Sequence, residues 1–263
     1  MYYLIRLTYI QYMINDPEIG ILYEDGDIVA VNKPSGLMVH GDGRAKLRFL
    51  TDWIVEKYPE TVNVGEPARD LKGEKIERHG IVHRLDRETS GALLVAKTQA
   101  GFDCLKKQFQ DRVIKKKYLA YIWGDLKEEF GTINRPIGRS VTDFRKWSAQ
   151  RGARGELRDA ETYWTKLKNL NGRTEEQKCE PFTLVEVEPK TGRTHQIRVH
   201  FSAIQHAVVG DQLYAPKKPR ALGFARTALH AVSIEFTNTA GTLVKVKAPL
   251  PDDFGLVNER FLC

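Results

Sequence analysis

One stretch of the sequence, His-Arg-Leu-Asp-Arg-Glu-Thr-Ser-Gly at residues 83–91, constrains the fold more than any other. The apolar pair at residues 81–82 leads into it, and the β-favouring run 92–96 leads out. Such flanks predict a loop held between buried strands. The loop carries the carboxylate of Asp86 between two arginines, and an Asp beside an Arg is most often a surface ion pair of little energetic value. The rest of the chain decides whether Asp86 is of that ordinary kind.

The charge of the chain points to a polyanionic partner. Its 263 residues carry a formal net charge of +7. This excess favours nucleic acid first and an acidic membrane second, and a basic soluble enzyme without such a partner is the alternative. No apolar run approaches the length of a membrane span, so we expect no membrane association.

The cysteines and the N-terminus bear on compartment and domain organisation. Cys104, Cys179 and Cys263 are widely spaced and form no CxxC motif, which predicts neither a disulfide framework nor a zinc knuckle and fits a reducing compartment. Residues 1–12 lack the small-residue cleavage site of a signal peptide. We expect residues 1–20 to be an N-terminal extension, with Met13 as the natural start, and residues 21–263 to form a single domain.

Apolar periodicity predicts a mixed α+β fold. Helices are expected from residue 47 to 58, after Thr98, and over residues 194–205. Strands are expected at residues 27–32, 92–96, 118–123, 161–167, 182–187, 229–236 and 243–246. Because the strands outnumber the helices and follow one another through short turns, we expect a mixed, mainly antiparallel sheet rather than regular βαβ winding. Residues 61–79 are polar and without periodicity, and we expect a long loop there.

Residues 131–158 differ in composition from the rest of the chain. Glycines interrupt the segment, and aromatic rings at Phe144 and Trp147 alternate with cations that include Arg135, Arg139, Arg145 and Lys146. Cations suit phosphates, and flat rings suit unstacked bases, so the segment is a candidate RNA-binding loop. A mobile surface loop is the alternative.

The motifs together resemble one known family. His-Arg-Leu-Asp-x-x-Thr-Ser-Gly at residues 83–91 is similar to the signature of the RluA-like pseudouridine synthases. Further segments resemble other motifs of that family in the same order, at residues 32–37, 117–120, 136–139, 191–200, 210–214 and 228–231. The resemblance extends from about residue 21 to residue 249. Each motif alone is weak, but the ordered set is specific.

The resemblance implies the pseudouridine synthase fold, with a central active-site cleft, and isomerisation of uridine in RNA to pseudouridine. By this resemblance Asp86 is the essential aspartate, Tyr118 packs on the target base, and Arg198 pairs with the aspartate. Arg84 matches a residue that helps to displace the base, and Arg193 is expected with Arg84 among the RNA-binding residues. Many relatives carry an S4-type RNA-binding domain before the first motif, and we expect none here.

The chemistry explains why these residue types are needed. The C1′–N1 bond breaks, the uracil turns, and C5 bonds to C1′. An ionised Asp86 can trap the electron-poor ribose carbon, abstract a proton as a glycal forms, or add to uracil C6, and the sequence leaves these open. A nearby Arg198 favours the ionised form. Tyr118 supplies a flat face and a hydroxyl that can assist loss of the C5 proton, while the guanidinium of Arg84 can fill the gap left by an extruded base.

Other kinds of site fit the sequence less well. His195 and His200 are about 140° apart on a helix and no cysteine is near, so we expect no metal site and no cofactor. A GxSxG nucleophile motif is absent from the sequence. Two alternatives to the isomerase remain: a non-catalytic RNA-binding protein of the same fold, and a nucleosidase that uses Asp86. We expect a cytoplasmic monomer without an obligatory protein partner that acts on a stem-loop of tRNA or rRNA.

Overall fold

The structure is a computed structural model of the chain, and it describes residues 18–41, 48–66, 68–69, 73, 75–76, 78–150, 153–255, 257 and 262–263. The prediction that Met13 is the natural start lies outside the described residues, as do parts of the predicted loop at 61–79. Within these segments no helix is long and apolar enough to cross a membrane.

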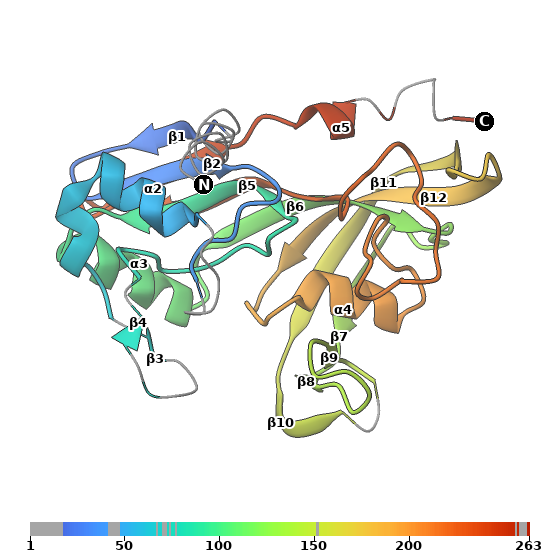
Figure 1. The fold of residues 1–263 in the computed structure, drawn as a ribbon, viewed down its shortest axis with the longest axis horizontal. Coiled ribbons are helices and arrows are strands. Elements are labelled where there is room, and N and C mark those ends of the chain that lie inside the picture. The colour runs from blue at the N-terminus through green and yellow to red at the C-terminus, as the bar shows by residue number, and fades with distance from the viewer. Residues whose placement is uncertain are drawn as a thin grey trace, which may run out of the picture.

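Nine strands in the described part of the chain form one sheet that extends across the molecule (Figure 1). In spatial order they are β1 (Gly20–Glu24), β2 (Ile28–Lys33), β5 (Ser90–Ala96), β13 (Leu229–Thr237), β6 (Lys115–Trp123), β12 (Cys179–Pro189), β11 (Glu161–Arg173) and β7 (Phe130–Asn134), while β14 (Leu243–Lys247) pairs with β13. Of the strand pairs between these segments, β5 and β13 are parallel and the others are antiparallel. The predicted mixed, mainly antiparallel sheet is therefore confirmed.

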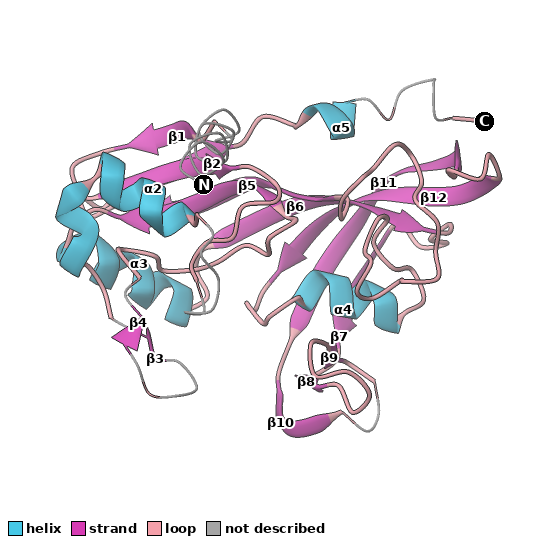
Figure 2. Ribbon diagram, viewed as in Figure 1, coloured by secondary structure: helices cyan, strands magenta, loops and turns pink. Residues whose placement is uncertain are grey.

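Strands β2 and β5 are buried on both faces. Successive side chains of a strand point to opposite faces of the sheet. Val29 and Val31 pack in one core with α2 (Leu50–Lys57), and Ile28 and Ala30 pack in another with α3 (Gln99–Gln110). Burial on both faces explains the continuous apolar runs of these two strands. In Figure 2, α2 and α3 lie at the end of the sheet formed by β1, β2 and β5, and α4 (Gln196–Ala203) lies near β11 and β12.

The helix boundaries follow from local chemistry. Helix α2 begins at Leu50 and ends at Lys57, within the predicted 47–58, with Tyr58 as its C-cap, and the 3-10 helix η1 (Pro59–Asn63) follows. Helix α3 begins after Thr98, whose hydroxyl oxygen accepts the Gly101 N–H at 3.1 Å. Helix α4 is shorter than the predicted 194–205, because His195 has a φ of 56°, in the left-handed region, and precedes its first turn.

The interpretation of residues 131–158 as one loop is wrong. Strand β7 joins the main sheet, and β8 (Ile137–Arg139), β9 (Trp147–Ser148) and β10 (Arg154–Arg158) form a small separate sheet (Figure 1). Ile137 is buried in a cluster with Val199 of α4, so an apolar contact anchors this sheet. These strands are short and rich in glycine and charge, which hides their pattern. The predicted loop 61–79 likewise contains a two-stranded hairpin of β3 (Ala68–Arg69) and β4 (Lys75–Ile76).

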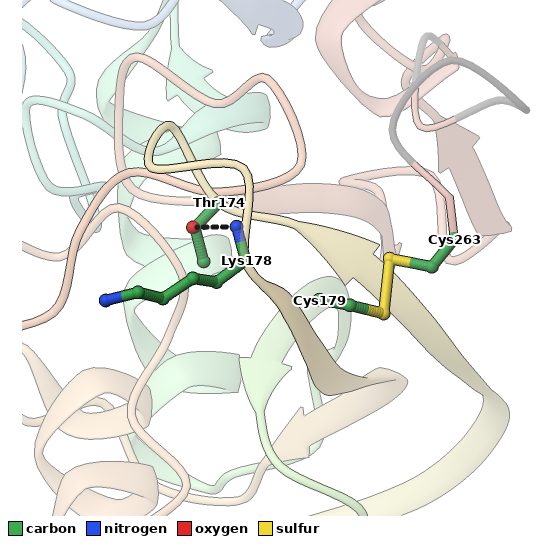
Figure 3. Close-up of a disulfide and its surroundings, with 4 residues drawn as sticks. All are labelled: Thr174, Lys178, Cys179 and Cys263. Atoms are coloured by element: carbon green, nitrogen blue, oxygen red, sulfur yellow. Dashed lines mark hydrogen bonds between the residues drawn. A yellow bond between two sulfur atoms is a disulfide. The ribbon is translucent and has the colours of Figure 1, made fainter.

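A disulfide joins the end of the chain to the β11–β12 hairpin, which the sequence analysis did not predict (Figure 3). Cys179 bonds to Cys263, 84 residues later, with the Cα atoms 6.2 Å apart. The Cys263 N–H donates to the Asn171 carbonyl at 3.1 Å, which brings the terminus alongside the hairpin. Spacing along the sequence does not report such a contact. Cys104 is free. The last helix of the described residues, α5 (Asp252–Gly255), lies before this terminus.

Candidate active site

A cleft of about 470 Å³ contains most of the residues that the signature motifs predict. Its lining comes from the loop before β5, the end of α3, strand β6, and the turn that leads into α4. The charged and aromatic lining residues are His83, Arg84, Asp86, Phe109, Arg112, Lys116, Tyr118, Lys190, Arg193, His195 and Arg198. Among the described residues Asp86 is the one carboxylate in this lining.

Asp86 lies in a loop that the neighbouring strands hold in place. Ile81 is buried and forms an isolated antiparallel bridge with Val95, and β5 begins at Ser90. Within the loop the Thr89 N–H donates to the Asp86 carbonyl at 3.1 Å, closing a turn. Leu85 is buried beneath the turn. The sequence pattern correctly predicted a loop pinned between buried segments.

Arg198 joins Asp86 to a second carboxylate. Its Nη1 donates to Asp86 Oδ2 at 2.9 Å, while Nε and Nη2 donate to Asp211 Oδ2 and Oδ1 at 2.7 and 2.9 Å. Asp211 is fully buried, and its Oδ1 also accepts the backbone N–H groups of Leu213 and Tyr214, each at 3.0 Å. The planar guanidinium thus makes two parallel hydrogen bonds to the Asp211 carboxylate, and its third nitrogen, Nη1, donates to Asp86.

The two carboxylates keep Arg198 charged, and the hydrogen bonds around Asp86 leave one of its oxygens free. Burial lowers the pKa of Arg198, but the hydrogen bonds and charges of Asp211 and Asp86 outweigh it and raise the pKa above its ordinary value. Asp86 Oδ1 accepts no hydrogen bond from the described residues, and His195 Nε2 lies 3.9 Å from it. One oxygen of Asp86 is therefore held and the other is open to a ligand.

His195 and Tyr214 form the support behind Asp86. His195 Nδ1 lies 2.9 Å from the Tyr214 hydroxyl, which also accepts the Trp147 N–H at 3.1 Å. Burial raises the pKa of Tyr214 to about 12, so the phenol keeps its proton at neutral pH. Burial also lowers the pKa of His195, and Arg198 lowers it further against the opposing charge of Asp86. A neutral His195 with its proton on Nε2 can accept from Tyr214 and present an N–H toward Asp86.

Tyr118 lies in β6, with Ala231 and Val187 as its register partners on the two adjacent strands. Burial raises the pKa of its phenol well above the ordinary value, and the charge of Asp86 raises it further. Tyr118 therefore presents a neutral, protonated ring to the same cleft as Asp86. A phenolate that removes the C5 proton is disfavoured, whereas a flat surface for a base is available.

The comparisons with known proteins agree with this geometry. A family model described as RNA pseudouridylate synthase matches residues 27–203. The chain belongs to this family. The family members are isomerases of RNA, and the match includes the loop with Asp86, strand β6 with Tyr118, and α4 with Arg198.

Individual relatives cover most of the chain. An uncharacterised RNA pseudouridine synthase YlyB of Bacillus subtilis is 36% identical over 92% of this chain and 73% of its own length. The dual-specificity RNA pseudouridine synthase RluA of Vibrio cholerae is 38% identical over 84% of this chain and 78% of its own length. Among solved structures, human RNA pseudouridylate synthase domain containing 1 is 28% identical with a TM-score of 0.68, covering 93% of this chain and 88% of that chain.

The pseudouridine synthase cleft includes some of the predicted RNA-binding residues and not others. Arg84 and Arg193 line it, and Arg193 Nε donates to the Asp159 carbonyl at 3.0 Å. Arg135, Arg139, Arg145 and Lys146 do not line it.

Each of the three arginines outside the cleft contacts another residue of the chain. Arg135 donates to the Ala203 carbonyl at 3.0 Å, and the guanidinium of Arg139 lies 4.1 Å from the centre of the Trp147 ring. Arg145 pairs with Asp143 through two hydrogen bonds, at 3.0 and 2.9 Å.

A buried lysine supports the Asp86 loop from the first motif. Lys33 is fully buried, and its ammonium donates to the carbonyls of Pro34, Leu37 and Arg87 at 2.7, 2.8 and 3.2 Å. Burial lowers the pKa of Lys33 to about 7, against the raising effect of the charge on Asp86. Arg87, whose role the sequence left unexplained, donates from Nε to the Gly36 carbonyl at 3.1 Å. Arg87 therefore ties the loop to the first motif.

A second support comes from the C-terminal part of the chain. Arg226 Nη1 donates to the Glu88 carbonyl at 3.1 Å, and Ser35 donates to the same oxygen at 2.9 Å. Arg226 is itself fixed by Asp253, with hydrogen bonds of 2.6 and 2.8 Å. No sequence pattern indicated a role for Lys33, Asp211 or Arg226, although the first two lie in segments that resemble family motifs.

Within the described residues, no three His, Cys, Asp or Glu side chains are placed to hold a metal ion together. The nitrogens and oxygens that line the cleft instead pair with one another or face its open space.

Proposed function

We propose that the catalytic centre of this RNA pseudouridine synthase is Asp86, with Tyr118 and Arg198, within a single catalytic domain at residues 21–263. One observation carries the assignment: Asp86 Oδ2 is held by Arg198 at 2.9 Å, while Oδ1 accepts no hydrogen bond from the described residues and borders the cleft. Arg198 is in turn fixed by Asp211, so the carboxylate is oriented before a substrate arrives. Orientation of this kind removes an entropic part of the barrier.

The proposed reaction follows from this arrangement. The C1′–N1 bond of the target uridine breaks, the uracil turns against the ring of Tyr118, the C1′–C5 bond forms, C5 loses its proton, and N1 gains one. The free oxygen of Asp86 attacks C1′, attacks C6 or removes a ribose proton in the three routes that the chemistry allows. In each route the guanidinium of Arg198 holds the Asp86 carboxylate in place through its hydrogen bond to Oδ2. Arg84 fills the place that the uridine leaves in the RNA, and Arg193 binds the RNA at the edge of the cleft.

The arrangement favours an isomerase over a nucleosidase. A glycoside hydrolase commonly needs a second carboxyl group about 5–9.5 Å from the first as acid or base. Among the described residues no carboxylate other than Asp86 lines the cleft. The oriented Asp86 and Arg198 pair likewise favours an enzyme over a non-catalytic RNA-binding protein, which has no need for a free, oriented carboxylate oxygen.

The proposed substrates are stem-loops of tRNA or rRNA. The names of two relatives support this range: RluA of Vibrio cholerae is called dual-specificity, and a protein of Nitrosomonas europaea, 34% identical over 89% of this chain, is called ribosomal large subunit pseudouridine synthase D. Arg135, Arg139, Arg145 and Lys146 are proposed to contact RNA outside the cleft. We propose a monomer without an obligatory protein partner.

We place the enzyme in the cytoplasm. The redox state of the Cys179–Cys263 pair in the cell tests this location. A reducing cytosol would open the Cys179–Cys263 disulfide to two thiols, since glutathione and thioredoxin keep exposed cysteines reduced. Alkylation of the protein in freshly lysed cells, followed by mass measurement, should label both cysteines. A blocked pair in the native cell would contradict the cytoplasmic assignment.

The function is tested by mapping pseudouridine in tRNA and rRNA from cells with and without the gene. At least one pseudouridine should disappear with the gene, and purified protein should restore it in RNA from the deletion strain. If no site changes in the cell and none forms in the test tube, the proposed substrates are wrong.

A further inference from the structure

Three consecutive lysines in β6 have different environments. Lys115 pairs with Glu235 at 2.8 Å, and Lys117 pairs with Glu186 at 2.6 Å. Lys116, between them, lines the active-site cleft and has no carboxylate partner among the described residues. It is on the same strand face as Tyr118, two residues further along, because strand side chains alternate.

The contacts of the Lys116 ammonium are few. Its Nζ donates one long hydrogen bond, of 3.5 Å, to the Thr191 carbonyl and lies 6.0 Å from the centre of the Phe109 ring. The side chain is half-buried. An ammonium has three donors and is unfavourable to bury without a partner. The position is therefore suited to an acceptor that is not part of the chain.

The charges of the cleft indicate the nature of that acceptor. One oxygen of Asp86 pairs with Arg198, and Lys190 pairs with Glu188. Arg84 and Arg112 line the same cleft, and neither makes an ion pair within the described residues. Unpaired cations from the loop before β5, the end of α3 and strand β6 thus surround a space whose one carboxylate among the described residues, that of Asp86, already pairs with Arg198. Such a space attracts an anion.

We propose that Lys116, with Arg112 at the end of α3, forms a phosphate subsite that binds the RNA backbone next to the target uridine. This inference rests on the proposed function. It places the RNA chain against the wall formed by α3 and β6, inside the cleft and apart from the arginines of residues 135–158. A compact ammonium suits a phosphodiester oxygen, and the exposed Arg112 can follow the neighbouring phosphate.

The surroundings of Lys116 make the subsite sensitive to pH. Burial lowers the pKa of Lys116 to about 8, and the charge of Lys190 lowers it further. The nearby His83 is neutral, because burial lowers its pKa to about 3, and Phe109 and the Thr191 carbonyl carry no net charge. A bound phosphate would raise the pKa of Lys116, so binding at this subsite takes up a proton above pH 8.

Salt dependence of binding tests the subsite directly. Affinity for unfractionated tRNA is measured from 50 to 200 mM salt for the wild type, Lys116→Met and the matched control Lys117→Met. Lys116→Met should weaken binding about tenfold and flatten the log–log salt slope by about 0.7–0.9, the change for one phosphate contact. Lys117→Met should keep the wild-type slope. An unchanged salt slope in Lys116→Met would overturn the proposal. If affinity falls while the slope stays the same, Lys116 binds a neutral acceptor such as a base carbonyl, and the proposal is likewise wrong.

Lys116→Arg is the second variant and keeps the test decisive if Lys116→Met does not fold. Arg stays charged, so tRNA affinity of Lys116→Arg should change less between pH 7 and 9 than that of the wild type and of Lys117→Met. Equal pH dependence in all three proteins would contradict the subsite. The two proposals fail separately: absence of pseudouridine formation by the wild type rejects the function, whereas normal formation with an unchanged Lys116→Met slope rejects only the subsite.

Discussion

The Asp86 loop and the segment at residues 135–158 are both rich in charge, yet the structure uses that charge differently. In the loop, carbonyls and side chains are fixed by residues far away in the sequence, such as Lys33, Arg198 and Arg226. In the segment, Arg145 pairs with Asp143, two residues away, and the neighbouring Phe144 is 86% exposed. A charge held by distant partners is oriented for chemistry, whereas a charge paired locally at the surface adds little energy.

Substitution of Asp86 should have the largest effect. Asp86→Asn keeps the shape of the side chain but removes the charge, so pseudouridine formation should fall by at least about a thousandfold. RNA affinity should stay nearly intact. Glu88→Gln is the matched control, because its carboxylate lies in the same loop but does not line the cleft, and it should keep activity. Comparable turnover in Asp86→Asn would reject the role of Asp86.

Asp211→Asn should have the next largest effect. It leaves Arg198 in a buried site with one carboxylate in place of two, and breaking a buried pair typically destabilises a protein by about 3–5 kcal/mol. We expect a lower melting temperature and a decrease in kcat of about tenfold or more, with KM unchanged. Calorimetry and steady-state kinetics measure both. A variant with normal kcat would show that Asp211 does not orient Arg198.

Arg226 connects the C-terminal part of the chain to the loop. Arg226→Met removes the hydrogen bond to the Glu88 carbonyl, and we expect kcat to fall about tenfold with little change in KM. Arg226→Lys should recover part of the activity, because an ammonium can still donate to that carbonyl. If Arg226→Met lowers both kcat/KM and the melting temperature, and Arg226→Lys recovers neither, Arg226 has a purely structural role.

His83 makes the stability of this region depend on pH. Its folded-state pKa is about 3, below the ordinary value of 6.5, because burial disfavours the imidazolium. The unfolded chain therefore binds the proton more readily, and stability should fall as pH decreases below 6.5, by up to about 1.4 kcal/mol per pH unit. His83→Gln should reduce this slope, as measured by urea unfolding at pH 7 and 5. An identical slope in both proteins would place the effect elsewhere.

The smallest effects are expected from the surface arginines. Arg139→Met and Arg145→Met should each leave kcat unchanged and flatten the salt slope of tRNA binding by at most about 0.7. If none of the four cations at 135–146 changes the slope, the segment faces solvent. A decrease in kcat in Arg139→Met or Arg145→Met would instead show that the segment takes part in catalysis, and it would then not differ from the Asp86 loop in function.

Local patterns explain what the sequence could predict. The cap at Thr98 and the apolar runs of β2 and β5 depend on neighbours in sequence, and the structure confirms these elements. The pairing of Asp86 with Arg198 was predicted through the family resemblance, since no local pattern joins residues 112 positions apart.

Long-range polar contacts explain what the sequence could not predict. Asp211, Lys33 and Arg226 act through partners that only the folded chain brings together. Cys179 and Cys263 meet because the terminus returns to the β11–β12 hairpin. The short strands β8 and β9 pack against α4 through Ile137 and Trp147, a contact that their own sequence pattern does not reveal.

The structure of Asp86→Asn bound to a substrate RNA tests the central claim most directly. We predict a uridine turned out of its stem-loop, with its base against Tyr118 and its ribose C1′ or base C6 within about 3.5 Å of the side chain at position 86. RNA bound only along residues 135–158, with the cleft empty, would contradict the account.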